Sequence, residues 1–161
     1  MSVTVIYGSD NGTTENIAKR IANKLQGKAV NISSATTADF EGADLLVLGS
    51  PTYGMGNLQP DWEDNLDKLQ GANLQGRKVA LFGLGDQSAY PDTYVDAMGL
   101  LYDEVVAKGA TVVGATSTSG YDFTESLAKR DGKFVGLALD EESQSSKTDD
   151  RLEAWIGQIK G

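Results

Sequence analysis

Short apolar runs alternate along the chain with polar segments that carry apolar residues at helical spacing. The runs at 3–7, 45–48 and 79–82 are continuous and rich in Val, Ile and Leu. This composition is typical of parallel strands that are buried on both faces. Weaker runs at 28–32 and 111–113 predict two more strands.

The last of these strands is expected to be interrupted. After 111–113 the chain turns polar over 116–132, which indicates an excursion from the sheet. The apolar run 134–139 can then resume the same strand. After the second strand, a polar stretch follows to Gly42.

Between these runs, apolar residues recur every three or four positions, which predicts helices. The first helix follows residue 14 and is expected to stop at Gly27. The second begins at Pro60, and the third ends near Gly109. The fourth closes the chain, with Thr148 or Asp149 as its cap. The expected buried faces are Ile17, Ala18, Ile21, Ala22 and Leu25; Trp62, Leu66 and Leu69; Val95, Met98, Leu101, Tyr102 and Val105; and Leu152, Trp155, Ile156 and Ile159.

This alternation predicts an α/β fold: a doubly wound parallel sheet of five strand units, with helices on both faces. The chain of 161 residues has no internal repeat and no linker-like segment, so we expect residues 1–161 to form one domain.

Composition narrows the chemistry. Neither cysteine nor histidine occurs, which excludes thiolate nucleophiles, cysteine-bound metals and the commonest general base. The net charge of −9 disfavours nucleic acids and anionic membranes as partners. The first residues resemble no signal peptide and no run is long enough to span a membrane, so we expect a soluble, cytoplasmic protein.

Three loops at the carboxyl ends of strands are candidates for a ligand site: 8–14, 50–59 and 83–92. In sheets of this kind ligands bind at that edge. The first loop leads into a helix start, where backbone N–H groups favour an anion. It lacks the Gly-Lys-Ser/Thr of nucleotide triphosphate sites and the Gly-x-Gly-x-x-Gly dinucleotide motif, so it suits a phosphate monoester.

The other two loops each carry a tyrosine, Tyr53 and Tyr90, among turn-forming residues. Taken singly, either ring could simply shield the edge of the sheet. Beside a phosphate site, however, two rings on separate loops favour a cofactor with a planar ring at one end and a phosphate at the other. FMN has this shape.

The chain resembles the long-chain bacterial flavodoxins over nearly its full length. The segment Ser9-Asp10-Asn11-Gly12-Thr13-Thr14 is similar to the phosphate loop of that family. The stretches from Pro51 to Trp62 and from Phe82 to Tyr90 match its two flavin loops. Residues 120–123 and 133–140 resemble the insertion that splits the last strand in the long-chain branch.

The resemblance implies a three-layer fold with strand order 2-1-3-4-5, and FMN held without a covalent bond. Three residues depart from the usual motif: Asn11 replaces a hydroxyl residue, Tyr53 a frequent Trp, and Leu84 a frequent Thr. The expected FMN contacts are Ser9, Asp10, Asn11, Gly12, Thr13, Thr14, Pro51, Thr52, Tyr53, Gly54, Met55, Gly56, Gly83, Leu84, Gly85, Asp86, Tyr90 and Thr93. No catalytic residue and no metal site are expected.

The resemblance also implies a low-potential one-electron carrier without a substrate of its own. Its expected partners are basic-surfaced redox proteins, such as an NAD(P)H-dependent flavodoxin reductase and a low-potential acceptor enzyme, and we expect a monomer. Asp61, Glu63, Asp64 and Asp67, faced only by Lys68, would disfavour further negative charge on the flavin or form a solvated helix face. In the family the Gly54–Met55 peptide is expected to flip on one-electron reduction.

Two other functions remain open at this stage. An FMN-dependent quinone or nitro reductase would need a nicotinamide site, and the sequence offers no basic pocket for a 2′-phosphate. A signalling receiver domain needs an acidic cluster after the first strand and a Lys after the fifth. Asp10 stands alone after the first strand, and no Lys occurs near Thr116.

Overall fold

A central parallel sheet organises the computed structural model, which describes residues 2–9, 12–53 and 56–160. The neighbouring strands run in the order β2, β1, β3, β5, and the short strands β6 and β10 both pair with β5. This confirms the expected order 2-1-3-4-5 with a divided fifth strand. The bounds are β1 Val3–Tyr7, β2 Lys28–Asn31, β3 Leu45–Tyr53, β5 Lys78–Leu84, β6 Thr111–Val113 and β10 Leu137–Leu139.

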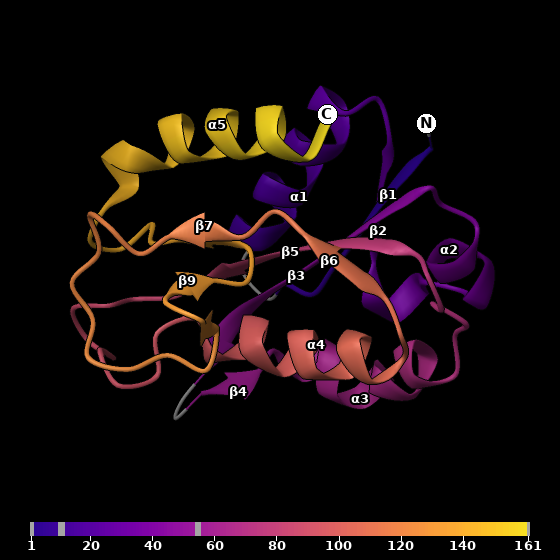
Figure 1. Ribbon diagram of the computed structural model, residues 1–161, viewed down its shortest axis with the longest axis horizontal. Helices are drawn as coiled ribbons and strands as arrows, with labels where there is room; N and C mark the ends of the chain where they lie inside the picture. The colour runs from indigo at the N-terminus through magenta and orange to yellow at the C-terminus, as the bar shows by residue number, and fades with distance from the viewer. Residues whose placement is uncertain (1, 10–11, 54–55, 161) are drawn as a thin grey trace.

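Helices cover both faces of the sheet (Figure 1). On one face lie α1 (Thr13–Lys24) and α5 (Thr148–Lys160), and on the other α3 (Pro60–Gln70) and α4 (Asp96–Ala107). Each face buries one tryptophan, as expected: Trp62 on α3 and Trp155 on α5. Each indole N–H donates a 2.8 Å hydrogen bond to a backbone oxygen, of Gly49 and Gly114 respectively, so the polar group of each ring is satisfied inside the core.

The connection between β2 and β3 is more ordered than the sequence suggested. It contains a 3₁₀ turn, η1 (Ile32–Ser34), and a short helix, α2 (Thr37–Glu41). The Asp39 carboxylate accepts hydrogen bonds from the N–H and the hydroxyl of Thr36, at 2.8 and 3.2 Å. This local cap starts the helix, and a single buried aromatic, Phe40, anchors it.

Two helix ends differ from the expectation. The first helix ends at Lys24, and Gln26 rather than Gly27 adopts the left-handed conformation, with φ of 57°. Gly27 is instead required by contact, because a Cβ there would lie 2.3 Å from the Val3 carbonyl oxygen. The cap expected at Thr148 or Asp149 was wrong. The 3₁₀ turn η2 (Ser145–Lys147) runs directly into α5, so both residues already lie inside the helix.

The excursion between β6 and β10 forms a small antiparallel sheet of its own, in the order β7, β9, β8. Its strands are β7 (Thr116–Ser117), β8 (Lys129–Arg130) and β9 (Lys133–Phe134). The main strand therefore resumes at Leu137 and not at Phe134. Gly136 lies at this transition, where a Cβ would come within 2.0 Å of the Leu81 carbonyl oxygen. Among the described helices, none has the length and apolar character to cross a membrane.

Candidate functional site

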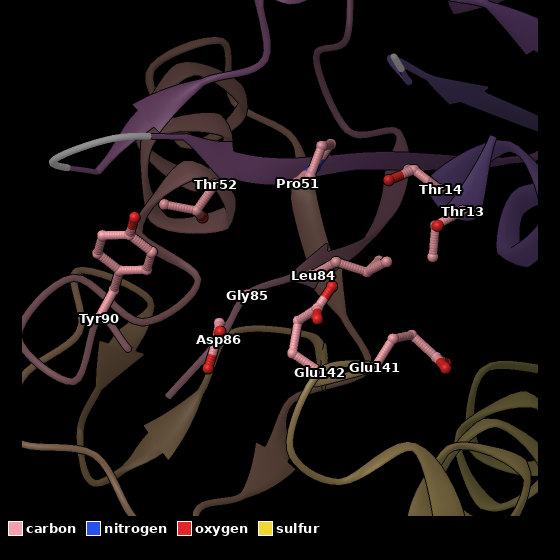
Figure 2. Close-up of a pocket in the computed structure, with 10 residues that line it drawn as sticks. All are labelled: Thr13, Thr14, Pro51, Thr52, Leu84, Gly85, Asp86, Tyr90, Glu141 and Glu142. Atoms are coloured by element: carbon pink, nitrogen blue, oxygen red, sulfur yellow. The ribbon is translucent and has the colours of Figure 1, made fainter. Parts of the chain in front are cut away.

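A cleft of about 260 Å³ opens at the carboxyl ends of β1, β3, β5 and β10 (Figure 2). Thr13 and Thr14 lie at one end and Tyr90 at the other, with Pro51 and Leu84 between them. All three loops expected from the sequence contribute to it. The lining residues are Thr13, Thr14, Pro51, Thr52, Leu84, Gly85, Asp86, Tyr90, Glu141 and Glu142.

The first end of the cleft is the start of α1. Gly12 occupies the N-cap position with φ of 87°. The Gly12 N–H donates to the Ser9 hydroxyl at 3.1 Å, which folds the loop back on itself. The Thr14 side chain is almost fully buried. Exposed helix N–H groups and threonine hydroxyls together make a donor set for an anion. The expected contacts Asp10 and Asn11 lie outside the described residues.

The middle of the cleft is the end of β3, which continues through the segment that we expected to be a loop. Strand β3 pairs in an antiparallel sense with β4 (Asn57–Leu58), Thr52 with Leu58 and Tyr53 with Asn57, as the two strands of a hairpin. Thr52 Oγ1 accepts a 3.0 Å hydrogen bond from the Ala97 N–H and so ties the hairpin to the start of α4. The expected contacts Gly54 and Met55 lie outside the described residues, as does the side chain of Tyr53.

The far end of the cleft is the loop after β5. The Asp86 carboxylate accepts hydrogen bonds from the N–H groups of Ser88 and Ala89, each at 3.1 Å, and so stabilises the turn of its own loop. That turn presents Tyr90, whose side chain is 55% exposed. An exposed aromatic ring beside a cleft can cover one face of a planar ligand.

Comparison with known proteins decides the family. A sequence profile of the flavodoxin family matches residues 5–155. A flavodoxin of Nostoc sp. is 42% identical and one of Synechocystis sp. 43%; each alignment covers 98% of this chain and 95% of the relative. The crystal structure of Fusobacterium nucleatum flavodoxin bound to flavin mononucleotide has a TM-score of 0.93 at 38% identity, covering 99% of this chain and 96% of that one. This chain belongs to the flavodoxin family.

Five expected contacts of this flavodoxin do not line the cleft: Ser9, Gly12, Gly56, Gly83 and Thr93. A Cβ on Gly83 would lie 3.0 Å from the Met98 side chain, so Gly83 allows close packing of β5 on α4. The Thr93 carbonyl oxygen accepts from the Asp96 N–H at 3.2 Å, next to the start of α4. Gly56, with φ of 101°, has its Cα against the Asp96 carboxylate, where a Cβ would lie 2.7 Å from Oδ2. Ser9, Gly12 and Gly56 flank the cleft without lining it.

The sequence analysis missed two residues that line the cleft, Glu141 and Glu142. They follow β10 directly, so the rule that points to the carboxyl ends of strands could have found them. The three expected loops follow the first, third and fourth strands, and none of them follows the end of the divided fifth strand. With Asp86, they give the cleft three carboxylates, and no Lys or Arg is among the described residues that line it.

Two buried carboxylates beside the cleft have opposite properties. Burial raises the pKa of Asp96, and neighbouring Glu125 adds to this effect, against one stabilising hydrogen bond from the Leu127 N–H. Burial also acts to raise the pKa of Asp140, but hydrogen bonds from Ser143 and Gln87 outweigh it and leave the pKa below its usual value. Within the described residues, no group of three or more acidic side chains is arranged to hold a metal ion.

Proposed function

We propose that this flavodoxin holds FMN non-covalently in the cleft and carries single electrons between redox proteins. The observation that carries the proposal is the layout of the cleft. A helix start with buried Thr14 lies at one end, and an exposed aromatic ring lies at the other. The FMN-bound relative from Fusobacterium nucleatum supports the same cofactor here.

The residues present fit that group. Ser9, Thr13, Thr14 and the first N–H groups of α1 would hold the phosphate as neutral donors, together with Asp10, Asn11 and Gly12. Apolar Pro51 and Leu84 would flank the ring, and Tyr90 would cover one face of it. We assign the remaining ring contacts to Thr52, Tyr53, Gly54, Met55, Gly56, Gly85 and Asp86, with Gly83 and Thr93 supporting their loops.

Bound FMN supplies the one-electron chemistry, and the chain tunes it. Asp86, Glu141 and Glu142 place negative charge around the cleft. A unit charge about 4 Å away costs about 1 kcal/mol in water, and more where water is excluded. On the one-electron scale this is about 40 mV per charge. The carboxylates thus disfavour added negative charge in the cleft and lower the potential.

The chain is an electron carrier and not an enzyme with its own substrate, as the names of its relatives support. The test is a visible spectrum recorded during stepwise reduction of purified protein. We expect one FMN per chain and two separate one-electron steps. A protein purified under FMN-replete conditions that retains no flavin would refute the proposal. Bleaching by NADPH alone, with no reductase present, would favour the alternative of a quinone or nitro reductase.

The expected partners are basic-surfaced proteins: an NAD(P)H-dependent reductase as donor and a low-potential enzyme as acceptor. The acidic residues on α3 support this, because the lysine beside them, Lys68, does not neutralise their negative charge. The Lys68 ammonium instead donates to the backbone oxygens of Ile32 and Ser33, each at 3.2 Å. A monomeric state and a cytoplasmic location stay predictions of the sequence.

Rates with a basic reductase test the acidic surface. They should fall steeply as salt rises, because salt screens the attraction between exposed charges. Changing both Asp64 and Asp67 to Lys should slow association and leave the unfolding midpoint nearly unchanged. Rates that respond neither to salt nor to this double change would assign the acidic residues to solubility alone.

A further inference from the structure

Asp140 is fully buried, yet it carries a carboxylate. It follows β10 directly, and five hydrogen bonds converge on its two oxygens. Oδ2 accepts from the backbone N–H of Gln87 (3.0 Å), from its side-chain amide (2.9 Å) and from the Ser143 hydroxyl (2.5 Å). Oδ1 accepts from the N–H groups of Glu142 (3.1 Å) and Ser143 (2.9 Å).

These donors come from the loops that follow β5 and β10, both of which line the cleft. Gln87 belongs to the loop that contributes Gly85, Asp86 and Tyr90. Glu142 and Ser143 belong to the loop that contributes Glu141 and Glu142. The two loops meet through this single side chain and through one backbone bond, from the Gly85 N–H to the Leu139 oxygen at 3.1 Å.

Gln87 extends the connection to the excursion between β6 and β10. Its side chain is almost completely buried, and its amide oxygen accepts a 2.5 Å hydrogen bond from the Asp122 N–H. One glutamine therefore bonds Asp140 through its amide nitrogen and the excursion through its amide oxygen. Three segments far apart in the sequence are joined at this point.

The negative charge of Asp140 is balanced by these donors. No Lys or Arg in the described ranges forms an ion pair with it. Hydrogen bonds to a buried carboxylate are stronger than those to a neutral acceptor. A buried carboxylate without its hydrogen-bond donors costs folding free energy, so Asp140 holds its donors in place.

We propose that Asp140 is a positioning residue for the flavin: its carboxylate fixes the 85–90 loop against the 141–143 loop and so sets the width of the cleft between these two loops. This inference rests on the proposed function. Among the described residues of the 9–14 loop none bonds to Asp140, so a change at Asp140 removes none of the hydrogen bonds that those residues make.

Asp140→Asn tests this directly. The amide replaces one oxygen by an NH2 group, which then faces N–H donors, so at least two of the five hydrogen bonds are lost. We expect affinity for FMN and for riboflavin to fall by the same factor, about tenfold or more. The ratio of the two affinities should stay at its wild-type value, because the phosphate end is unchanged.

A second readout does not involve flavin. Hydrogen exchange of the apoprotein should show faster exchange at the N–H groups of Gln87 and Ser143 in Asp140→Asn, with β1 and β3 unchanged. Asp39→Asn is the matched control, because Asp39 also caps backbone and hydroxyl donors but lies beside α2. It should lower stability without changing either flavin affinity.

Gln87→Met carries the test if Asp140→Asn does not fold. It removes the side-chain bonds to Asp140 and Asp122 and keeps the backbone bond. We therefore expect both flavin affinities to fall, by a smaller factor than in Asp140→Asn. Wild-type affinity for riboflavin in the folded variant, or unchanged exchange at Ser143 and at residue 87, would overturn the proposal. Failure of the wild-type protein to bind FMN would instead overturn the proposed function, and the exchange experiment distinguishes the two.

Discussion

The two ends of the cleft are built in different ways. The phosphate end comes from one continuous stretch, residues 9–14, in which a loop runs into the first turn of α1. The rest of the cleft comes from three stretches, after β3, β5 and β10, held by contacts between residues more than 40 positions apart. The first needs only local geometry, whereas the second exists only when the whole sheet is assembled.

The largest expected effect separates the two ends by changing the ligand. Riboflavin has the ring of FMN without its phosphate, so it should use the ring end alone. Because several charge-assisted hydrogen bonds are lost, we expect riboflavin to bind about a hundredfold or more weakly than FMN. Fluorescence titration of the apoprotein measures both constants. Equal affinities would remove the phosphate role of residues 9–14.

Thr14→Ala tests the phosphate end from the protein side. The hydroxyl is buried and its loss should cost about 1–3 kcal/mol, or about 5- to 150-fold in FMN affinity. Riboflavin affinity should not change. Thr14→Ser keeps the hydroxyl and should restore most of the FMN affinity. A matching loss for riboflavin would mean that Thr14 supports the fold of the site and not the phosphate.

Tyr90→Ala tests the ring end. Loss of ring stacking should weaken FMN and riboflavin alike by about 2- to 10-fold, from about 0.5–1.5 kcal/mol of aromatic contact. Tyr102→Ala serves as control, because that ring lies on α4 under Arg130 and outside the cleft. An effect on FMN alone would contradict the assignment of Tyr90 to the ring.

The smallest effect concerns Asp96, beside the hairpin at the ring end. Its pKa in the folded protein is raised, so its stability contribution is lost as pH rises above the unfolded value of about 3.9. The hollow that contains Asp96 is lined by three other charged residues: Asp92, Glu125 and Lys129. Thermal melts should show that the stability of Asp96→Asn rises relative to that of the wild type between about pH 4 and pH 7.

Asp44→Asn gives the opposite sign and serves as the control for Asp96→Asn. A hydrogen bond from the Ser2 N–H lowers the pKa of Asp44, so its charge stabilises the fold above the unfolded pKa. Its removal should therefore cost stability at neutral pH. Melts in which both variants shift in the same direction would contradict the assigned directions.

Sequence patterns predicted the central strands and the helix start after Gly12, for a physical reason. Continuous apolar runs such as Leu45–Leu48 have few alternatives to a central buried strand, and Gly12 before two threonines marks a helix start. These signals are local. The same is true of Trp62 and Trp155, whose helical spacing placed them correctly in the core.

The ring end could be predicted only in part. Tyr90 and Leu84 follow a strong strand and were found, but Glu141, Glu142 and the role of Asp140 were not. Their strand, β10, has three residues, and the apolar run 134–139 that predicted it did not show that its carboxyl end reaches the cleft. It is held beside β5 by pairing with Phe82, Gly83 and Leu84, which is tertiary information. Thr36 and Asp39 are a recognisable capping box for α2. The helix itself is too short for apolar periodicity to indicate it.

The divided fifth strand has a consequence for protein engineering. Val113 pairs with Ala80 and Leu137 with Phe82, so the chain leaves the sheet and returns almost at the same place. A longer or shorter excursion would change the entropy of loop closure by only about 0.6 kcal/mol for each doubling of length. The segment between β6 and β10 is therefore a suitable site for inserting another domain into a redox carrier. The insert must retain a backbone N–H for Gln87 where Asp122 now supplies it.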